Sequence, residues 1–372
     1  MYRFVRGEGI CLYDQDDKAY VDLISGIAVN NLGHRNPKIT KAIKKQVSKY
    51  SHQMVYGEYV VGPQVKLAER LAKLLPKNLQ SFYFLNSGSE AAEGAMKLAK
   101  KYTNRHKIVA MRNAYHGSTS GALSMMSDEY YSSPFKPLLP NIYFADFNDI
   151  SSLSLIDKET AAVFIEPIQA EKGYVPATKE FLSALREKCN ETGTLLVFDE
   201  IQSGIGRTGK LYAFEHYEIY PDILLSAKAL GGGMPIGVFI SSKKIMDSLS
   251  DNPILGHITT FGGHPVSCAA GNAAIKYLTK SKLMDEVDEK EALFRELLVH
   301  PKIKGISGKG LMLAVQLESF EEVERTMKRC IDRGVIIDWF LYNLECLRIS
   351  PPLIISKKQI KEVCKVLLKA LD

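Results

Sequence analysis

Short apolar runs recur between residues 82 and 241, and several of the segments between them place apolar side chains three and four positions apart. Uninterrupted apolar runs are typical of strands buried on both faces, while the wider spacing, clearest at 90–102 and 179–190, predicts crossover helices. The expected strands cover residues 82–85, 107–111, 142–145, 162–167, 195–198, 222–226 and 237–241. We therefore expect an α/β fold with a mostly parallel seven-stranded sheet covered by helices.

Beyond residue 265 the pattern becomes richer in helix signals and holds only short strand candidates. The helical segments cover 286–298, 321–332 and 357–371, and the strand candidates cover 310–317 and 346–352. Hairpin-like runs at 11–23 have no helical pattern nearby, so we expect them to join this C-terminal region. The predicted organisation is an N-terminal segment at 1–45 packing with a small α+β domain at 271–372, and a large α/β domain at 46–270.

Composition and charge exclude several classes of protein. The chain has 372 residues, of which 46% are hydrophobic and 24% charged, which is typical of a soluble globular protein. The 48 basic side chains exceed the 42 acidic ones by six, and both signs alternate along the sequence without a basic run. We therefore expect no nucleic-acid partner.

The cysteines and the apolar segments bear on location. None of the six cysteines forms a C-x-x-C pair or lies at metal-ligand spacing, and the first ten residues lack the apolar core of a secretory signal. We expect a cytoplasmic protein without a metal. The apolar stretch at 223–240 is long enough to cross a membrane, but its glycines and proline favour a strand, a turn and a second strand.

Two charged residues stand where chemistry is expected, because ligands of open α/β sheets bind at the carboxyl ends of strands. Lys228 follows the run at 222–226 and precedes a glycine-rich turn. Apolar surroundings lower the pKa of a lysine and make it a nucleophile suited to Schiff-base chemistry. Asp199 follows the run at 195–198 and needs a cation: a substrate amine, a metal, a protonated ring nitrogen or a structural ion pair.

Residues after two further predicted strands could bind the phosphate and the ring of a cofactor. After the run at 82–85, Ser87 and Glu90 have the spacing of a capping box, and the backbone N–H groups of Gly88 and Ser89 would lie at the positive end of a helix, where phosphate binds. The aromatic Tyr115, beside His116, follows another run and could stack on a flat cofactor. A phosphate seat, a lysine, an acid and an aromatic ring are together what pyridoxal 5'-phosphate (PLP) requires.

The string GIGRTG at 204–209 leaves an alternative of a different class, a nucleotide-binding protein, because it matches the pattern G-x-G-x-x-G. Its context is unfavourable, since residues 199–203 separate it from its strand and no clear long helix follows. A P-loop is excluded because Leu211 stands where a Ser or Thr must bind magnesium.

The chain resembles the class III aminotransferase family, which includes ornithine, acetylornithine and 4-aminobutyrate aminotransferases. The strings that carry this resemblance are FVRGEGICLYDQDDKAYVDLISGIAVNNLGH at 4–34, NSGSEAAEGAMKLA at 86–99, AYHG at 114–117, EPIQAEKG at 166–173, FDEIQSGIGRTG at 198–209, PDILLSAKALGGGMPIG at 221–237 and HITTFGGHP at 257–265. The resemblance implies a fold-type I homodimer with its active site at the subunit interface.

The resemblance also implies roles for residues. Lys228 corresponds to the Schiff-base lysine, Asp199 to the partner of the pyridine nitrogen, and Thr260 to the residue that completes the phosphate site of the neighbouring subunit. Glu171 corresponds to a glutamate that pairs with Arg348, which otherwise grips a substrate carboxylate. The other cofactor-binding candidates are Ser87, Gly88, Ser89, Tyr115, His116, Glu200 and Gln202, of which Gln202 would reach the ring hydroxyl; the other substrate-binding candidates are Ser118 and Thr259.

The implied reaction moves the terminal amino group of an ω-amino acid to 2-oxoglutarate. The amino donor stays open, because acetylornithine enzymes carry an arginine where this chain has Ser118. His264 replaces the usual asparagine, and Lys172 replaces a small residue. Use of 4-aminobutyrate or another ω-amine, racemisation, and transfer linked to decarboxylation are therefore alternatives.

Overall fold

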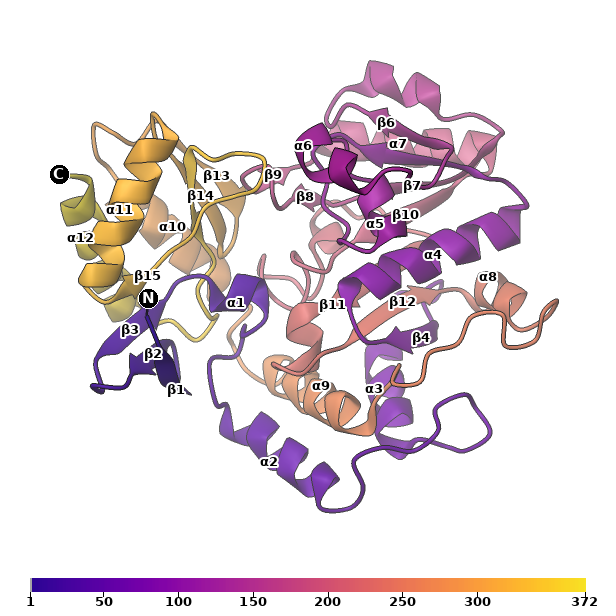
Figure 1. Cartoon of the computed structure of the whole chain (residues 1–372), viewed down its shortest axis with the longest axis horizontal. Coiled ribbons are helices and arrows are strands. Elements are labelled where there is room, and N and C mark those ends of the chain that lie inside the picture. The colour runs from indigo at the N-terminus through magenta and orange to yellow at the C-terminus, as the bar shows by residue number, and fades with distance from the viewer. Residues whose placement is uncertain (1) are drawn as a thin grey trace.

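The computed structural model describes residues 2–372 and contains a central seven-stranded sheet with helices packed around it (Figure 1). The strand order is β4-β12-β11-β10-β7-β5-β6. The strands are β4 (Ser81–Leu85), β5 (Lys107–Met111), β6 (Ile142–Ala145), β7 (Thr160–Ile165), β10 (Leu195–Asp199), β11 (Ile223–Ala227) and β12 (Gly237–Ser241). Only β12 runs antiparallel to its neighbours in this sheet. The predicted mostly parallel sheet of seven strands is confirmed.

The apolar runs form strands because both faces of the sheet are buried. Successive residues of β10 belong to different hydrophobic clusters: Leu196 and Phe198 to one, Leu195 and Val197 to the other. The helices α4 (Gly88–Thr103) and α7 (Lys179–Thr192) cover the sheet, and each begins at a residue whose side chain caps the helix. Alternation of side chains across a strand thus requires apolar residues at every position.

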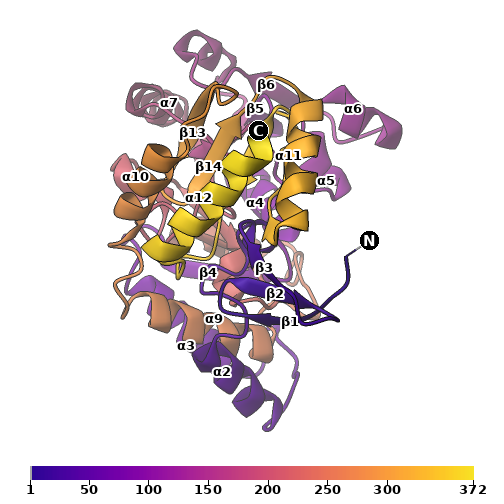
Figure 2. The same cartoon turned by 90° about the vertical axis from the view of Figure 1, so that its left-hand side faces the viewer.

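A smaller body contains residues from both ends of the chain (Figure 2). Strand β3 (Ala19–Asp22) pairs in parallel with β15 (Val335–Ile336), which places the N-terminal strands β1 (Phe4–Glu8) and β2 (Cys11–Asp14) in one sheet with the C-terminal region. A second sheet contains β13 (Gly305–Lys309), β14 (Met312–Gln316) and β16 (Cys346–Ile349), and the helices are α10 (Val287–Leu297), α11 (Phe320–Asp332) and α12 (Lys357–Leu371).

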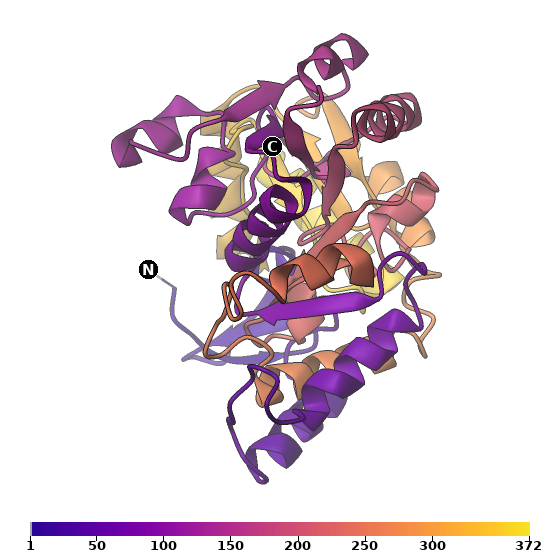
Figure 3. The ribbon, with the colours of Figure 1, turned by 90° about the vertical axis from the view of Figure 1, so that its right-hand side faces the viewer.

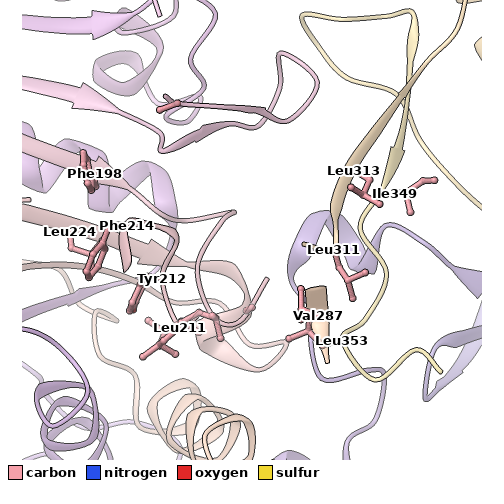
Figure 4. Packing of buried hydrophobic residues seen from close by; sticks show 14 of the residues in the cluster. Phe198, Leu211, Tyr212, Phe214, Leu224, Val287, Leu311, Leu313, Ile349 and Leu353 are labelled. Carbon is pink, nitrogen blue, oxygen red and sulfur yellow. The ribbon is translucent and has the colours of Figure 1, made fainter. Parts of the chain in front are cut away.

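One hydrophobic cluster extends through both bodies (Figure 4). Phe198 and Leu224 contribute to it from the large sheet, while Leu313 and Ile349 contribute from the smaller body. Burial of apolar side chains on both sides of this junction stabilises the arrangement of the two bodies.

A third layer is formed by α2 (Pro37–Val47), α3 (Gly62–Ala72) and α9 (Pro265–Leu278), with α9 packed against both other helices (Figure 3). The domain boundaries predicted at 45/46 and 270/271 both fall inside helices of this layer. We therefore propose that the divisions lie before α2 and after α9, because a domain boundary rarely interrupts a packed helix.

The remaining elements are short, and no helix within residues 2–372 is long and apolar enough to cross a membrane. They are α1 (Ser25–Ala28), α5 (Ser120–Ser124), α6 (Glu129–Ser132), α8 (Lys243–Met246), β8 (Ile168–Gln169), β9 (Val175–Pro176), and the 3₁₀ turns Ser133–Phe135, Ile150–Leu155, Ala213–His216, Lys228–Gly231 and Asp247–Leu249. The apolar stretch at 223–240 forms β11, a turn and β12, as its glycines predict.

Candidate active site

A cavity of about 380 Å³ lies at the carboxyl ends of β10 and β11, beside the start of α4. Eight of the residues predicted from the sequence line it: Ser87, Gly88, Ser89, Tyr115, His116, Asp199, Gln202 and Lys228. They come from four segments that are far apart in the chain and meet because parallel strands present their carboxyl ends at one edge of a sheet.

Lys228 directly follows β11 and adopts a left-handed backbone conformation, with a φ of 45°. Such a conformation is unfavourable for a residue with a side chain and is retained where the surroundings impose it, often at functional sites. Burial lowers the pKa of the Lys228 amine, and the nearby Glu171 carboxylate raises that pKa only in part. A lysine with these properties is a nucleophile at the wall of the cavity.

Asp199 ends β10 and forms a buried pair with His116. Its Oδ2 lies 2.8 Å from Nδ1 of His116, and its Oδ1 accepts a hydrogen bond from the backbone N–H of Ile201 at 3.0 Å. Burial by itself lowers the pKa of His116, but the hydrogen bond and the negative charge of Asp199, with that of Glu166, raise this pKa above its usual value. The raised pKa favours a protonated imidazole beside the Asp199 side chain.

Glu166 also lines the cavity, although the sequence analysis assigned it no role. Its Oε2 accepts a hydrogen bond from the backbone N–H of Tyr115, and its Oε1 accepts one from Ala170, each at 3.1 Å. Burial raises the pKa of Glu166 to about 8. Its signal in the sequence was an acid that directly follows a buried strand, the same criterion that singled out Asp199.

The start of α4 forms one end of the cavity. Ser87 is the N-cap residue, and its Oγ accepts a hydrogen bond from the backbone N–H of Glu90 at 3.2 Å. Glu90 accepts from the backbone N–H of Asn86 at 2.6 Å, one residue earlier than in the predicted capping box. A Cβ atom on Gly88 would lie 2.9 Å from the terminal methyl group of Ile201, so a larger residue at this position would require that side chain to shift. The first turn of α4 thus brings its backbone N–H groups to the cavity, where an anion can bind.

Glu171 and Arg348 meet beside the cavity, together with Gln202. Arg348 donates two hydrogen bonds to the Glu171 carboxylate, at 2.7 and 3.1 Å, and a third to Oε1 of Gln202 at 3.3 Å. Tyr174 also donates to Oε1 of Gln202, at 3.0 Å. Burial raises the pKa of Glu171, but the charge and hydrogen bonds of Arg348, together with the charge of Lys228, lower this pKa below its usual value. A buried ion pair therefore adjoins the wall that Gln202 contributes to the cavity.

Three further predicted residues, besides Glu171, Arg348 and Glu200, lie outside the cavity lining. The Oγ of Ser118 is exposed and lies 3.1 Å from the hydroxyl of Tyr115. Thr259 accepts a hydrogen bond from the side chain of Asn86 at 3.0 Å. Thr260 is exposed, and a single chain does not bring it to the cavity.

Glu200, predicted to bind the cofactor, uses its carboxylate for contacts within the protein. It accepts hydrogen bonds from Ser203 Oγ at 2.6 Å and from the backbone N–H groups of Ala213 and Phe214 at 2.8 and 2.6 Å. Glu200 is fully buried and is not among the residues that line the cavity. Its position therefore suits a residue that holds the 201–214 loop in place rather than one that binds a cofactor.

The string at 204–209 forms a buried loop rather than an open nucleotide site. Arg207 is fully buried, and its guanidinium donates to the backbone carbonyls of Leu311, at 3.1 Å, and Pro351, and to the side chain of Asn31. No long helix follows the loop, and no group of residues in the described chain has the composition of a metal site. This arrangement argues against the nucleotide-binding alternative, since the G-x-G-x-x-G motif binds phosphate through an exposed loop at the start of a helix.

Comparison with known proteins agrees with this geometry. The model of the family described as Aminotransferase class-III matches residues 1–371. The chain is 40% identical over 371 residues to an acetylornithine aminotransferase of Aquifex aeolicus, covering 98% of this chain and 96% of that one. It is 39% identical over 378 residues to a succinylornithine transaminase of Yersinia pseudotuberculosis, covering 96% and 89%. A solved ornithine aminotransferase of Toxoplasma gondii, described with partial occupancy of PLP at its active site, superposes with a TM-score of 0.91 at 29% identity, covering 100% and 90%.

Proposed function

The chain belongs to the aminotransferase class-III family, and we propose that it moves the terminal amino group of an ω-amino acid similar to acetylornithine to 2-oxoglutarate, giving an aldehyde and glutamate. The observation that carries the proposal is that Lys228 and Asp199 line one cavity at the start of α4. The names of the related acetylornithine and succinylornithine enzymes support a donor of this class.

The residues around the cavity fit PLP. The cavity offers an amine without an ion-pair or hydrogen-bond partner in the described chain, the buried side chain of an aspartate and a helix start that can hold a phosphate. When bound, PLP supplies an aldehyde that reacts with amines and a protonated ring that withdraws electrons from the reacting carbon. Lys228 would hold the aldehyde carbon, Asp199 the ring nitrogen, Tyr115 the ring face, and Gly88 and Ser89 the phosphate.

The side chains of the chain itself then carry the proton chemistry. Lys228 would act as the base once the incoming donor has replaced it on the cofactor. Its lowered pKa would let the free amine take a proton from the substrate carbon and pass it to the cofactor carbon that the amine had held. The raised pKa of His116 gives Asp199 a cationic partner at 2.8 Å. Glu166 fixes the backbone of Tyr115, which orients the aromatic ring.

The pair of Glu171 and Arg348 explains how one site can accept two different acids. With the pair closed, the charge of Arg348 is neutralised, and the cavity wall suits an ω-amino group on an uncharged chain end. With the pair open, Arg348 can bind a carboxylate of the 2-oxo acid in a two-point contact. The two halves of a transamination require these two states in turn.

We further propose a homodimer in the cytoplasm. Large apolar side chains are exposed around Thr260, including Ile254, which is 76% exposed, and Val60, which is 82% exposed. The others near them in sequence are Met54, Tyr59, Leu255, Ile258 and Phe261. A second copy covering this face would bury these side chains and bring Thr260 to the partner's cavity. All six cysteines are free, which suits a reducing compartment.

A steady-state panel of amino donors against 2-oxoglutarate tests the proposed reaction. We expect acetylornithine, succinylornithine or ornithine to give glutamate. Formation of no glutamate from any ω-amino donor, by protein that has bound PLP, would contradict the proposal.

A donor of the 4-aminobutyrate type is the second candidate, and Ser118 is the observation that favours it. An arginine at position 118 could hold an α-carboxylate with two hydrogen bonds, whereas the Ser118 hydroxyl offers one neutral hydrogen bond. A donor without an α-carboxylate would bind equally well with serine or arginine at this position, because it has no group for the arginine to hold. The ratio of kcat/KM for 4-aminobutyrate to that for acetylornithine decides between the two candidates.

A further inference from the structure

Helices α2 and α9 pack together in the outer layer of the large body (Figure 1). A groove lined by lysines runs between them. It encloses about 580 Å³. One side of the groove, or bank, carries Lys38, Lys41 and Lys45 from α2. The other bank carries Lys276 from α9 and Lys280, which follows that helix. The uncharged part of its lining includes Ala42, Ala273 and Tyr277. The groove shares no residue with the cavity that contains Lys228.

The five lysines of this groove lack neutralising partners. Each is exposed, and none forms an ion pair with an acidic side chain within residues 2–372. The α2 helix carries four lysines and no acidic residue, and Lys38, Lys41 and Lys45 follow the spacing of one helix face. Like charges at such short range repel one another, so an anion in the groove would relieve this repulsion.

Both signs of charge alternate along the sequence without a basic run, and the groove shows that lysines can still gather on one surface of the folded chain. Lys45 and Lys276 are more than two hundred positions apart, and only the packing of α2 on α9 gathers their charges on one surface. A local excess of lysines thus exists in space without a long basic run in the sequence.

We propose that this groove binds an organic polyphosphate of the nucleoside polyphosphate class, which goes beyond the transamination proposed above. Lysine is a compact point charge that suits phosphate, and the groove has no arginine, the side chain that matches a planar carboxylate at two points. The volume is in the range of small-molecule sites, and the Tyr277 ring with the alanine methyl groups forms an apolar surface for a flat base.

The test measures binding of ATP to the full-length protein loaded with PLP, by calorimetry in buffer without magnesium. We expect saturable binding of one ATP per chain that weakens as salt is added, because phosphate contacts are screened. Inorganic tripolyphosphate, adenosine and polyglutamate are compared under the same conditions. Tripolyphosphate should bind more weakly than ATP, and polyglutamate should not compete for the site.

Two charge-reversal variants locate the site. The double variant Lys41→Glu with Lys280→Glu changes one lysine on each bank and should weaken ATP binding about tenfold or more. The matched control, Lys66→Glu with Lys73→Glu, makes the same charge change at exposed positions on and just after α3, outside the groove, and should leave ATP affinity nearly unchanged. The groove variant should keep wild-type transamination, since it leaves the Lys228 cavity intact.

Tyr277→Leu tests the base-binding surface, because leucine keeps an apolar contact with the neighbouring core and removes the ring. ATP affinity should decrease about fivefold or more, with no change for tripolyphosphate. Equal loss of ATP binding in the groove variant and the control variant, equal affinity for tripolyphosphate and ATP, or binding of polyglutamate alone would each overturn the proposal. Because transamination is measured separately, failure here does not bear on the proposed reaction.

Discussion

Glu171 and Arg348, which are 177 positions apart in the chain, form a two-point ion pair in the protein interior. The Nη2 atom of Arg348 lies 2.7 Å from Oε2 of Glu171, and only 2% and 6% of the two side chains is exposed. The same guanidinium reaches Gln202 in the wall of the candidate active site. The state of this pair therefore sets the charge that a substrate meets there.

Glu171→Ala should change the balance of the two half-reactions rather than abolish both. Without the carboxylate, Arg348 stays free to bind carboxylates, so glutamate should become a better donor relative to the ω-amino acid. Single-turnover absorbance of the bound cofactor measures each half-reaction. Glu171→Gln is the matched control, because its amide keeps a hydrogen bond to Arg348 without the charge. Equal slowing of both half-reactions in the alanine variant would argue against a switch.

Purified protein should be yellow, and borohydride should attach the cofactor irreversibly to Lys228. The expectation rests on an amine whose pKa burial lowers and which has no competing partner in the structure as described. Peptide mapping of the reduced protein identifies the modified residue, with Lys172 as the internal control. Modification of another lysine, or of none, would disprove the assignment of Lys228.

Asp199→Asn should keep the fold and some bound cofactor but lose most turnover. Loss of a charge-assisted contact to a cationic ring costs on the order of 2 to 4 kcal/mol in the transition state. Asp222→Asn is a matched control, because Asp222 lies just before β11, where its carboxylate accepts from Arg186 at 2.9 Å and from the backbone of Leu196 at 2.8 Å. That control should lower thermal stability and spare kcat. Near wild-type turnover of Asp199→Asn would instead make Asp199 a structural acid.

The stability of the protein should fall as the pH rises towards 8, because of Glu166. Burial raises the pKa of this carboxyl from 4.5 to about 8, so between these values the folded chain holds a proton that the unfolded chain has released. The free energy of unfolding should decrease by at most about 1.4 kcal/mol per pH unit, and the decrease should end above the pKa that Glu166 has in the folded chain. Urea unfolding across this window should show a flatter profile for Glu166→Gln, and an unchanged profile for the exposed control Glu159→Gln. A wild-type profile without this decrease would contradict the prediction.

Ser118→Arg should improve acetylornithine or ornithine as a donor. A two-point arginine contact to the α-carboxylate is stronger than one serine hydrogen bond by roughly 1.5 to 3 kcal/mol, or about one to two decades in affinity. Lys172 is the alternative cation, and its Nζ now donates to the backbone carbonyl of Tyr342 at 3.4 Å. Kinetics on Ser118→Arg and Lys172→Ala separate the two possibilities. Efficient use of acetylornithine by wild-type protein that Lys172→Ala leaves unchanged would contradict both.

The sequence alone was enough to predict the sheet and the edge at which the candidate active site lies. Seven apolar runs predicted seven strands, because a strand buried on both faces tolerates few polar side chains. Lys228 and Asp199 could be singled out because a charged residue at the end of such a run is costly unless it has a partner. Glu166 satisfies the same criterion but was not singled out, because the strand predicted at 162–167 included it, whereas β7 ends at Ile165.

Only the tertiary structure decided which distant residues act together. The pairing of Glu171 with Arg348 was implied by family resemblance, and the hydrogen bond that Arg348 donates to Gln202 depends on how β16 packs beside the large sheet. The burial of Arg207, the internal partners of Glu200 and the lysine groove between α2 and α9 had no signal in the sequence. Periodicity reports which side of an element faces the core, whereas charge placement depends on which elements pack together, and that is determined only when the whole chain folds.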